Sequence, residues 1–386
     1  MEADGFRELA AVTRIAEDVV MPHADQWDRE CVWPELALRS LQAAKLGGLV
    51  VPEHFGGLGR GLLGLLQACE VLGKADGSTA LCFGMHCVAT ACIAAKATSD
   101  QAERLLAPIC AGQHLTTLAL SEPGTGSHFY LPQAQLARVG GDGYSLSGNK
   151  CFVTNGGHAD SYVVSAVSAD ESAPPGHFSL LLVTAESPGI EWGEAWSGWG
   201  MRGNSSRSAV LRDVRVAGYN RLGQEGDQIW YVFGVVAPYF LVAMAGTYLG
   251  IAARALEEAR SHLKRRHYAH SGGALSEIGV LQHRLGLLWA NVERTRRLCY
   301  WAASCADRGE RDALPALCAA KAEVACSVVQ VTNDCMTLCG GSAYRDGTLL
   351  QRLLRDARAA DVMSPTTDLL YTWLGRALLD LPLLGE

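Results

Sequence analysis

The sequence predicts an α+β protein in which two helical regions flank a small β domain. Residues 1–117 carry apolar side chains at helical spacing, and residues 223–386 return to that spacing. Between them, residues 118–222 contain short apolar and β-branched runs separated by Gly, Pro, Asn and Asp, which is typical of strands. We expect three domains with these boundaries, packed as one composite structure because the helical regions lie on either side of a β insert.

The first helical region is indicated by apolar residues spaced three or four apart, with charged residues between them. They are Phe6, Leu9, Val12, Ile15 and Val19. The glycine-rich stretch 56–61 is not preceded by a strand, so we interpret it as a turn between helices rather than a phosphate-binding loop.

The β domain and the last helical region show different patterns. The strand-like runs are 151–154, 161–165, 178–183 and 209–216. Further along, one long apolar stripe at helical spacing predicts a buried bundle helix that needs no ligand to explain it. The stripe comprises Leu317, Val324, Val328, Val331, Cys335 and Leu338.

Composition excludes several functional classes. The 386 residues carry a formal charge of −7, and no long basic block is present, so we expect no nucleic-acid partner. The 13 cysteines form no CxxC pair or zinc pattern, which predicts reduced thiols and no metal site. The acidic start at residues 1–5 is unlike a signal peptide, and no apolar run reaches about 20 residues, so we expect a cytoplasmic protein without a membrane partner.

Four segments carry the functional signal. The first, 118–127, contains the turn Ser-Glu-Pro-Gly-Thr-Gly-Ser, whose hydroxyl and backbone N–H groups suit a polar ring edge. It is followed by Asn-Lys-Cys-Phe-Val-Thr-Asn-Gly-Gly at 149–157, by Trp-Gly-Met-Arg-Gly-Asn at 199–204, and by Gly340-Gly341 with Arg-Leu-Leu-Arg-Asp-Ala-Arg at 352–358. In this order and spacing the segments closely resemble the acyl-CoA dehydrogenase family over nearly the whole chain.

The resemblance implies an acyl-CoA dehydrogenase-like fold with an N-terminal helical domain, a middle β domain and a C-terminal four-helix bundle. It also implies FAD bound between the β domain and the bundle, in a homotetramer or homodimer. By position, the residues that would line the flavin in the β domain are Leu118, Leu120, Ser121, Ser127, Phe152, Val153 and Thr154. Ser127 would also contact the substrate, and Thr154 would bond near flavin N5.

Other cofactor contacts implied by the resemblance come from the last helical region. Arg265 matches an arginine that reaches the FAD pyrophosphate from a neighbouring subunit, a role suited to charge-assisted bonds. The remaining matches are Gln282, Thr337, Gly340, Gly341, Thr366 and Asp368. Thr337 and Asp368 replace residues that are more usual in the family.

The chain departs from the family in the substrate half of the site. Ser364 occupies the place of the glutamate that removes the α-proton, and a serine hydroxyl is a weak base. The earlier helix position that carries the glutamate in some members reads Tyr239-Phe240, and we assign both, with Ser127 and Ser364, to substrate binding. His128 replaces an aspartate, and Asp361 is a nearby carboxylate that we interpret as structural. The catalytic base stays unassigned.

The sequence therefore leaves three hypotheses open. The first is a flavoenzyme that acts by non-standard chemistry on an acyl thioester, of CoA or of an acyl carrier protein, in a specialised biosynthetic pathway. The second is a flavin-dependent monooxygenase or oxidase on the same scaffold. The third is a non-catalytic partner subunit of a hetero-oligomeric dehydrogenase. The electron acceptor would be an electron-transfer flavoprotein or O2.

Overall fold

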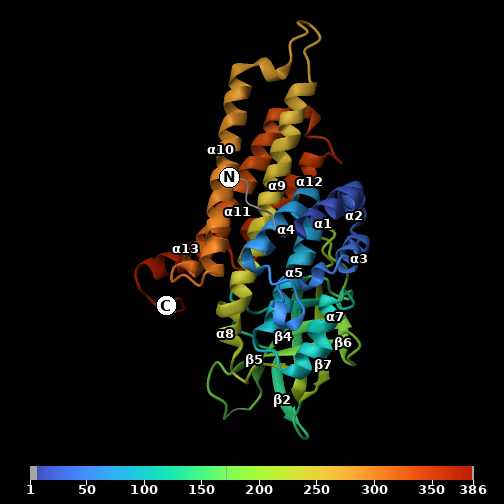
Figure 1. Cartoon of the computed structure of the whole chain (residues 1–386), viewed down its shortest axis with the longest axis vertical. Coiled ribbons are helices and arrows are strands. Elements are labelled where there is room, and N and C mark those ends of the chain that lie inside the picture. The colour runs from blue at the N-terminus through green and yellow to red at the C-terminus, as the bar shows by residue number, and fades with distance from the viewer. Residues whose placement is uncertain (1–6, 171, 385–386) are drawn as a thin grey trace.

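The computed structural model of the chain describes residues 7–170 and 172–384 (Figure 1). The acidic stretch 1–5 and Phe6 lie outside the described residues. The chain begins with helices, continues through an eight-stranded sheet and ends in a second set of helices, which is the predicted α+β order.

The first helical region packs beside both the sheet and the later bundle (Figure 1). The glycine-rich stretch 56–61 leads directly into α4, so the predicted turn between helices is confirmed. The helices of this region are α1 (Leu9–Ile15), α2 (Met21–Glu30), α3 (Glu35–Ala43), α4 (Gly61–Ala75), α5 (Gly77–Ala95), α6 (Ser99–Gln101) and α7 (Ala107–Cys110).

The middle region forms a mixed sheet with the order β6-β7-β3-β2-β4-β5-β8, and β1 pairs in parallel with β4. The strands are β1 (Thr116–Ala119), β2 (Gln135–Val139), β3 (Gly143–Val153), β4 (Ser161–Ser168), β5 (Phe178–Thr184), β6 (Ile190–Trp192), β7 (Arg207–Val216) and β8 (Arg221–Leu222). The antiparallel register of β3 and β7 is interrupted between Lys150 and Val153. Such an irregularity re-aims the side chains beside it.

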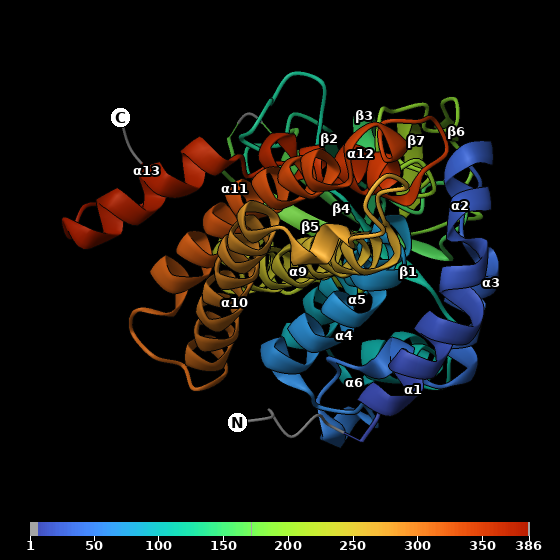
Figure 2. The same cartoon turned by 90° about the horizontal axis from the view of Figure 1, so that it is seen from above.

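The last region is built around α9, which packs against α4, α5, α10, α11 and α12. Every residue of the predicted α11 stripe, from Leu317 to Leu338, is buried, so the interpretation as a bundle helix is confirmed. The helices are α8 (Gln228–Tyr231), α9 (Ala237–Arg265), α10 (Gly279–Asp307), α11 (Ala313–Cys339), α12 (Leu349–Val362) and α13 (Thr367–Leu378). Seen from above, α12 crosses from the bundle toward α2 and the β3–β7 side of the sheet (Figure 2).

Three helical stretches are long and apolar enough, by length and composition alone, to cross a membrane. They are Gly77–Ala95, Gln228–Arg265 and Ala313–Ser342, and most of the apolar window within each is buried inside the fold. The expectation that no stretch reaches this length is therefore wrong. Its physical reason is that helices enclosed by other elements are apolar on nearly every side, even where single polar residues interrupt them.

The contact between α4 and α9 depends on glycines that face the opposite backbone. A Cβ on Gly250 would lie 2.2 Å from the Glu70 carbonyl oxygen, and one on Gly246 would lie 2.4 Å from that of Leu66. On the other side, a Cβ on Gly73 would lie 2.4 Å from the Thr247 oxygen. The two helices therefore approach each other more closely than any side chain would permit.

This contact makes a stability prediction. Gly250→Ala is expected to lower the free energy of unfolding by about 1–3 kcal/mol, because the methyl group forces α4 and α9 apart. Gly286→Ala in α10 is the matched control, since nothing lies within 4 Å of a Cβ there, and alanine is expected to add roughly 0.5–1 kcal/mol. Urea denaturation of both variants measures the two changes in unfolding free energy. Equal changes would contradict the packing argument.

Candidate active site

The irregular end of β3 exposes one aromatic ring and buries the residues after it. Phe152 has a φ of +53°, rare for a non-glycine residue, and its side chain is 65% exposed. Val153 and Thr154 are buried. The Thr154 hydroxyl lies 3.3 Å from the Ser206 hydroxyl, and the Thr154 carbonyl accepts a hydrogen bond from the Thr117 hydroxyl at 2.9 Å. The strand end thus holds Phe152 outward on a fixed support.

A buried ion pair fixes the turn that precedes Ser127. Lys150 Nζ lies 2.6 Å from Glu122 Oε1, and both side chains are almost fully buried. Lys150 also donates to the Ser165 carbonyl at 2.7 Å, and the Glu122 carboxylate accepts the backbone N–H groups of residues 133 and 134 at 2.7 and 3.2 Å. Burial lowers the pKa of Lys150, and the Glu122 carboxylate opposes that shift.

The turn also contacts the strand end directly. The Cys151 N–H donates to the Ser121 carbonyl at 2.9 Å, and the Lys150 ammonium lies 3.4 Å from the Leu120 carbonyl. Leu118 and Leu120 are buried beside the sheet, whereas Ser121 is half-buried. The structure therefore places Leu120 and Ser121 beside the strand end that carries Phe152.

The structure also joins this turn to the connection between α12 and α13. The Ser364 hydroxyl donates a hydrogen bond to the Ser127 carbonyl at 2.9 Å. The two residues are 237 positions apart, so their contact depends on the tertiary fold. Both are half-buried. The residue in the glutamate's place therefore lies beside the predicted flavin-facing turn, and it offers a hydroxyl instead of a carboxylate.

A buried lysine supports the backbone on both sides of Ser364. Lys321, on α11, is fully buried, and its ammonium donates to the carbonyls of Ala360, Met363 and Pro365 at 2.9, 3.3 and 3.0 Å. Burial lowers the pKa of Lys321 to about 8, and the nearby Asp361 carboxylate opposes the shift. These carbonyls lie in the last turn of α12 and directly after it, where a cation is favoured by the helix dipole.

The ionisable side chains that the sequence places in the substrate half are Asp361, Tyr239 and His128. Asp361 pairs with Arg358 and accepts from the Thr367 hydroxyl at 3.3 Å, so it ties α12 to α13, as expected for a structural residue. Burial raises the pKa of Tyr239 to about 12, which leaves a neutral phenol at physiological pH. His128 is exposed, with its ring centroid 5.7 Å from that of Tyr130.

The other predicted residues of the substrate half and of the adjoining helix are Phe240, Thr366 and Asp368. Phe240 is half-buried and packs against the core. Thr366 precedes α13, and its carbonyl accepts the Leu370 N–H at 3.0 Å. Asp368 is exposed in the first turn of α13.

A second group of predicted residues lies far from Phe152. Arg265 ends α9, is 70% exposed and pairs with Glu258 at 3.1 Å. The 29-residue α9 spans roughly 40 Å at 1.5 Å per residue, and Figure 1 shows its far end opposite the sheet. Within one chain, Arg265 therefore does not reach the Phe152 group.

The remaining predicted contacts share that distant end of the bundle. Gln282 lines a groove of about 520 Å³ between α9 and α10, beside the exposed Trp289. Thr337 lines a groove of about 400 Å³ between α10 and α11, and its hydroxyl donates to the Asn333 carbonyl at 3.2 Å. Gly340 and Gly341 follow directly on the surface.

Sequence reasoning missed the buried charged residues that support the site. Lys150 and Glu122 stand inside motifs that were recognised, but no role was assigned to them. Lys321 stands in a mostly apolar and small-residue stretch with Glu323 two residues on, and that setting was the available signal, because a buried charge needs partners. Arg355 and Asp356, on α12, also stand inside a recognised motif, and no role was assigned to them.

Comparison with known proteins identifies the family of the chain. Residues 6–113 match the N-terminal domain of acyl-CoA dehydrogenases, residues 117–214 the middle domain and residues 241–379 the C-terminal domain. The chain belongs to the acyl-CoA dehydrogenase family. It is 31% identical to cyclohex-1-ene-1-carbonyl-CoA dehydrogenase of Geobacter metallireducens, over 96% of this chain and 97% of that protein.

Several solved structures superpose closely on the chain. Butyryl-CoA dehydrogenase from Megasphaera elsdenii is 25% identical, with a TM-score of 0.91 and coverage of 98% of this chain and 100% of that chain. The prolyl acyl carrier protein oxidase AnaB is 22% identical, with a TM-score of 0.87 and coverage of 98% and 99%. These likenesses confirm the predicted acyl-CoA dehydrogenase-like fold.

The support beneath Ser364 makes a pH prediction. Between about pH 8 and 10, the unfolded chain keeps a proton on Lys321 that the folded chain has released, so this residue makes stability rise with pH by up to about 1.4 kcal/mol per pH unit. Lys321→Met removes that contribution. Denaturation at several pH values gives the unfolding free energy of wild type and variant. Their difference isolates the contribution of Lys321 from those of buried thiols and phenols, which both proteins share. Parallel curves would refute the assignment.

Proposed function

We propose that the chain is an FAD-dependent oxidoreductase that acts on an acyl thioester without the glutamate base of its family. The observation that carries the proposal is the 2.9 Å hydrogen bond from Ser364 to the Ser127 carbonyl. It sets the residue in the base position against the flavin-facing turn, yet supplies only a neutral hydroxyl.

The residues around the strand end fit a flavin. Phe152 offers an exposed aromatic face, Thr154 offers a hydroxyl, and the turn from Ser121 to Ser127 offers backbone and hydroxyl groups to a polar ring edge. Membership of the acyl-CoA dehydrogenase family supports FAD as the cofactor. A structure of PigA, 22% identical and of the same fold, is described as containing FAD and proline. When bound, FAD would supply a hydride acceptor.

The substrate half favours a reaction that needs no strong base. Ser364 is held by its donated hydrogen bond, and Tyr239 is a neutral phenol, so neither removes a proton from an ordinary acyl α-carbon at neutral pH. We therefore infer a substrate whose proton is already acidic, or one that loses CO2 in place of a proton. These residues orient the substrate and exclude water rather than act as its base.

The same departures from the family's residues bear on the acyl carrier of the substrate. The apolar and aromatic stretch 236–241 lacks the charged groups with which the family contacts CoA, which favours an acyl carrier protein over CoA. The likeness to AnaB, a prolyl acyl carrier protein oxidase, fits a carrier-bound substrate, and we place the reaction in a specialised biosynthetic pathway. An electron-transfer flavoprotein or O2 would reoxidise the flavin. The free thiols of all thirteen cysteines suit a cytoplasmic location.

A second copy of the chain would complete the cofactor site. Arg265 is exposed at the end of α9, far from Phe152, so a homodimer or homotetramer is needed for an arginine to reach the pyrophosphate of a flavin bound at the strand end. The exposed apolar residues of α10 are available to such an interface. They are Val280, Leu287, Trp289 and Trp301.

The proposal is tested by anaerobic flavin reduction. The FAD-loaded protein is titrated with matched acyl thioesters of CoA and of an acyl carrier protein, and loss of the visible flavin absorbance is recorded. Bleaching by a thioester supports the proposal. A homogeneous FAD-loaded protein that no thioester reduces contradicts it and favours a non-catalytic partner subunit. A product that gains one oxygen atom in air identifies a monooxygenase.

A variant at Ser364 tests the alignment of the site. Ser364→Glu restores a carboxylate, and we expect it to raise α,β-dehydrogenation of a plain acyl-CoA by at least about a hundredfold, the lower end of what a positioned acid or base contributes. Ser364→Gln is the matched control and lacks a titratable group. An equal gain in both variants would show that the carboxylate itself is not responsible.

The assembly proposal predicts a loss of FAD affinity. Arg265→Ala removes a charge-assisted phosphate contact, so we expect the FAD dissociation constant to rise by about 10- to 100-fold. Arg311→Ala, which removes another highly exposed arginine, serves as the control. Flavin occupancy after gel filtration and a fluorescence titration provide the readouts. Identical FAD binding by both variants would count against the role of Arg265.

A further inference from the structure

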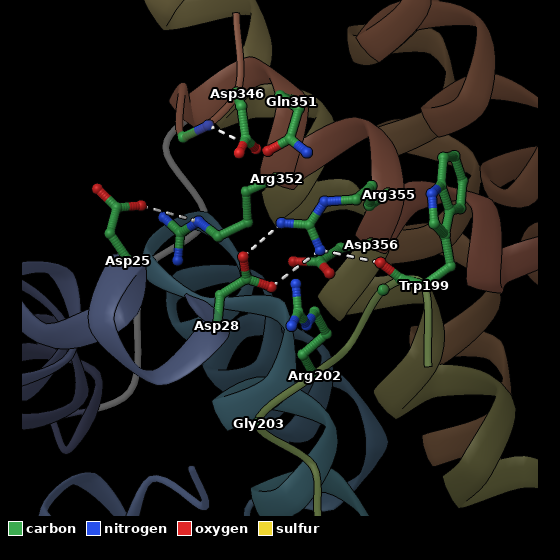
Figure 3. Close-up of polar contacts among 12 residues, drawn as sticks. Asp25, Asp28, Trp199, Arg202, Gly203, Asp346, Gln351, Arg352, Arg355 and Asp356 are labelled. Carbon is green, nitrogen blue, oxygen red and sulfur yellow. Dashed lines mark hydrogen bonds and ion pairs between the residues drawn. The ribbon is translucent and has the colours of Figure 1, made fainter. Parts of the chain in front are cut away.

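The loop at residues 199–203 lies against the backbone of α12 (Figure 3). The Arg355 guanidinium donates to the Trp199 carbonyl at 2.9 Å, and the Met201 N–H donates to Asp356 Oδ1 at 2.7 Å. A Cβ on Gly200 would lie 2.3 Å from the Arg355 carbonyl oxygen, so the two backbones are in direct contact. Consecutive residues of one helix thus hold two points of the loop.

The loop needs this support because its conformation is unfavourable. Met201 is almost fully buried and has a φ of +51°, a region that costs a non-glycine residue free energy. The hydrogen bond to Asp356 uses its N–H, which would otherwise lack a partner. Ser205, a few residues on, also has a positive φ of +49°. Strain of this kind persists only where the surroundings hold it.

The same loop leads to the aromatic ring that faces the flavin site. The Trp196 indole N–H donates to the Gly200 carbonyl at 3.1 Å. The Trp196 ring meets Phe152 edge to face, with the centroids 6.2 Å apart. Phe152 is itself in a strained conformation and largely exposed. A displaced loop would therefore remove the neighbour that limits the movement of Phe152.

After residue 203 the chain runs to the other flavin-facing residue. The Asn204 and Ser205 carbonyls accept the N–H groups of Asn155 and Gly156, each at 3.1 Å. The Ser206 hydroxyl then lies 3.3 Å from that of Thr154. The residues on either side of the loop that α12 holds, Trp196 and Ser206, are consequently in contact with Phe152 and Thr154.

Charged residues from two other helices fix α12 in turn. Arg355 forms a two-point ion pair with Asp28 of α2, and Arg352 pairs with Asp25 at 3.2 Å (Figure 3). Arg352 also lies 3.4 Å from Asp76, which caps α5 by accepting the Thr79 N–H.

Asp356 itself is fully buried within this group. Burial raises its pKa to about 7, and the Asp76 carboxylate adds to the shift, whereas the Met201 N–H and Arg352 oppose it. Burying a carboxylate costs free energy, so we expect Asp356 to have a specific structural role.

We propose that Asp356 and Arg355 are positioning residues for the flavin site, because they hold the 199–203 loop and, through it, the Phe152 ring. Neither residue touches the expected cofactor position; they act through Met201, Gly200 and Trp196. The inference rests on the proposed function for its cofactor, but the mechanical link can be measured without flavin.

The test uses hydrogen–deuterium exchange on the full-length apo-protein. Asp356→Ala is expected to speed exchange of the backbone amides at 199–206 by about tenfold or more, because a hydrogen bond to a charged acceptor is lost. Exchange in α9 and α11 is expected to stay unchanged. Asp356→Asn keeps an acceptor oxygen of the same shape and should give a smaller effect. Asp346→Asn, an exposed carboxylate before α12, is the control.

Two outcomes overturn the proposal. Unchanged exchange at 199–206 would show that Asp356 does not hold the loop, and a uniform rise that includes α9 and α11 would show a general loss of stability. A second measurement, FAD binding with the visible spectrum of the bound flavin, should show weaker binding and a shifted band in Asp356→Ala alone. If the wild-type protein binds no FAD, the proposed function fails, and the exchange result still decides whether the loop is held.

Discussion

Desolvation of charge is the constraint on which this structure depends. A charged group buried away from water must be paired or hydrogen-bonded, so each buried charge fixes the backbone that supplies its partners. Lys150 and Glu122 fix the turn before Ser127, Lys321 fixes the connection that carries Ser364, and Asp356 fixes the loop at 199–203. Three segments distant in sequence are thereby held around one surface, although none of these charged groups needs to contact a ligand.

The sequence predicted the architecture well because local patterns determine it. Helical spacing, short β-branched runs and turn residues follow directly from backbone geometry, so the order of helices and strands was accessible, as was the buried stripe on α11. The supports of the site were not accessible. Ser364 contacts Ser127, and Lys321 contacts the carbonyl of Pro365, only after several helices have packed. No spacing along the chain encodes these two contacts.

The length of unbroken apolar runs also misled, because it does not register how deeply a helix is enclosed by the fold. The stretch 77–95 is apolar because α5 is enclosed by its neighbours, and a count of unbroken apolar residues did not register it. Strained backbone, in contrast, collects near the candidate site. Positive φ values occur at Phe152, Asn155, Met201 and Ser205, around the end of β3 and the loop that contacts it. Such conformations are retained where surrounding contacts over-determine them, which is a property of preorganised sites.

The hydrogen bond between Ser364 and Ser127 has a consequence for recognition. The serine proton is committed to a backbone carbonyl, so the oxygen presents only lone pairs to whatever lies on its other side. A glutamate in that place would offer a negative charge and a site for a proton. The serine instead makes a small, neutral, acceptor-only surface. A molecule with a hydroxyl or N–H group opposite that surface would satisfy the oxygen, whereas a bare methylene would leave it unpaired.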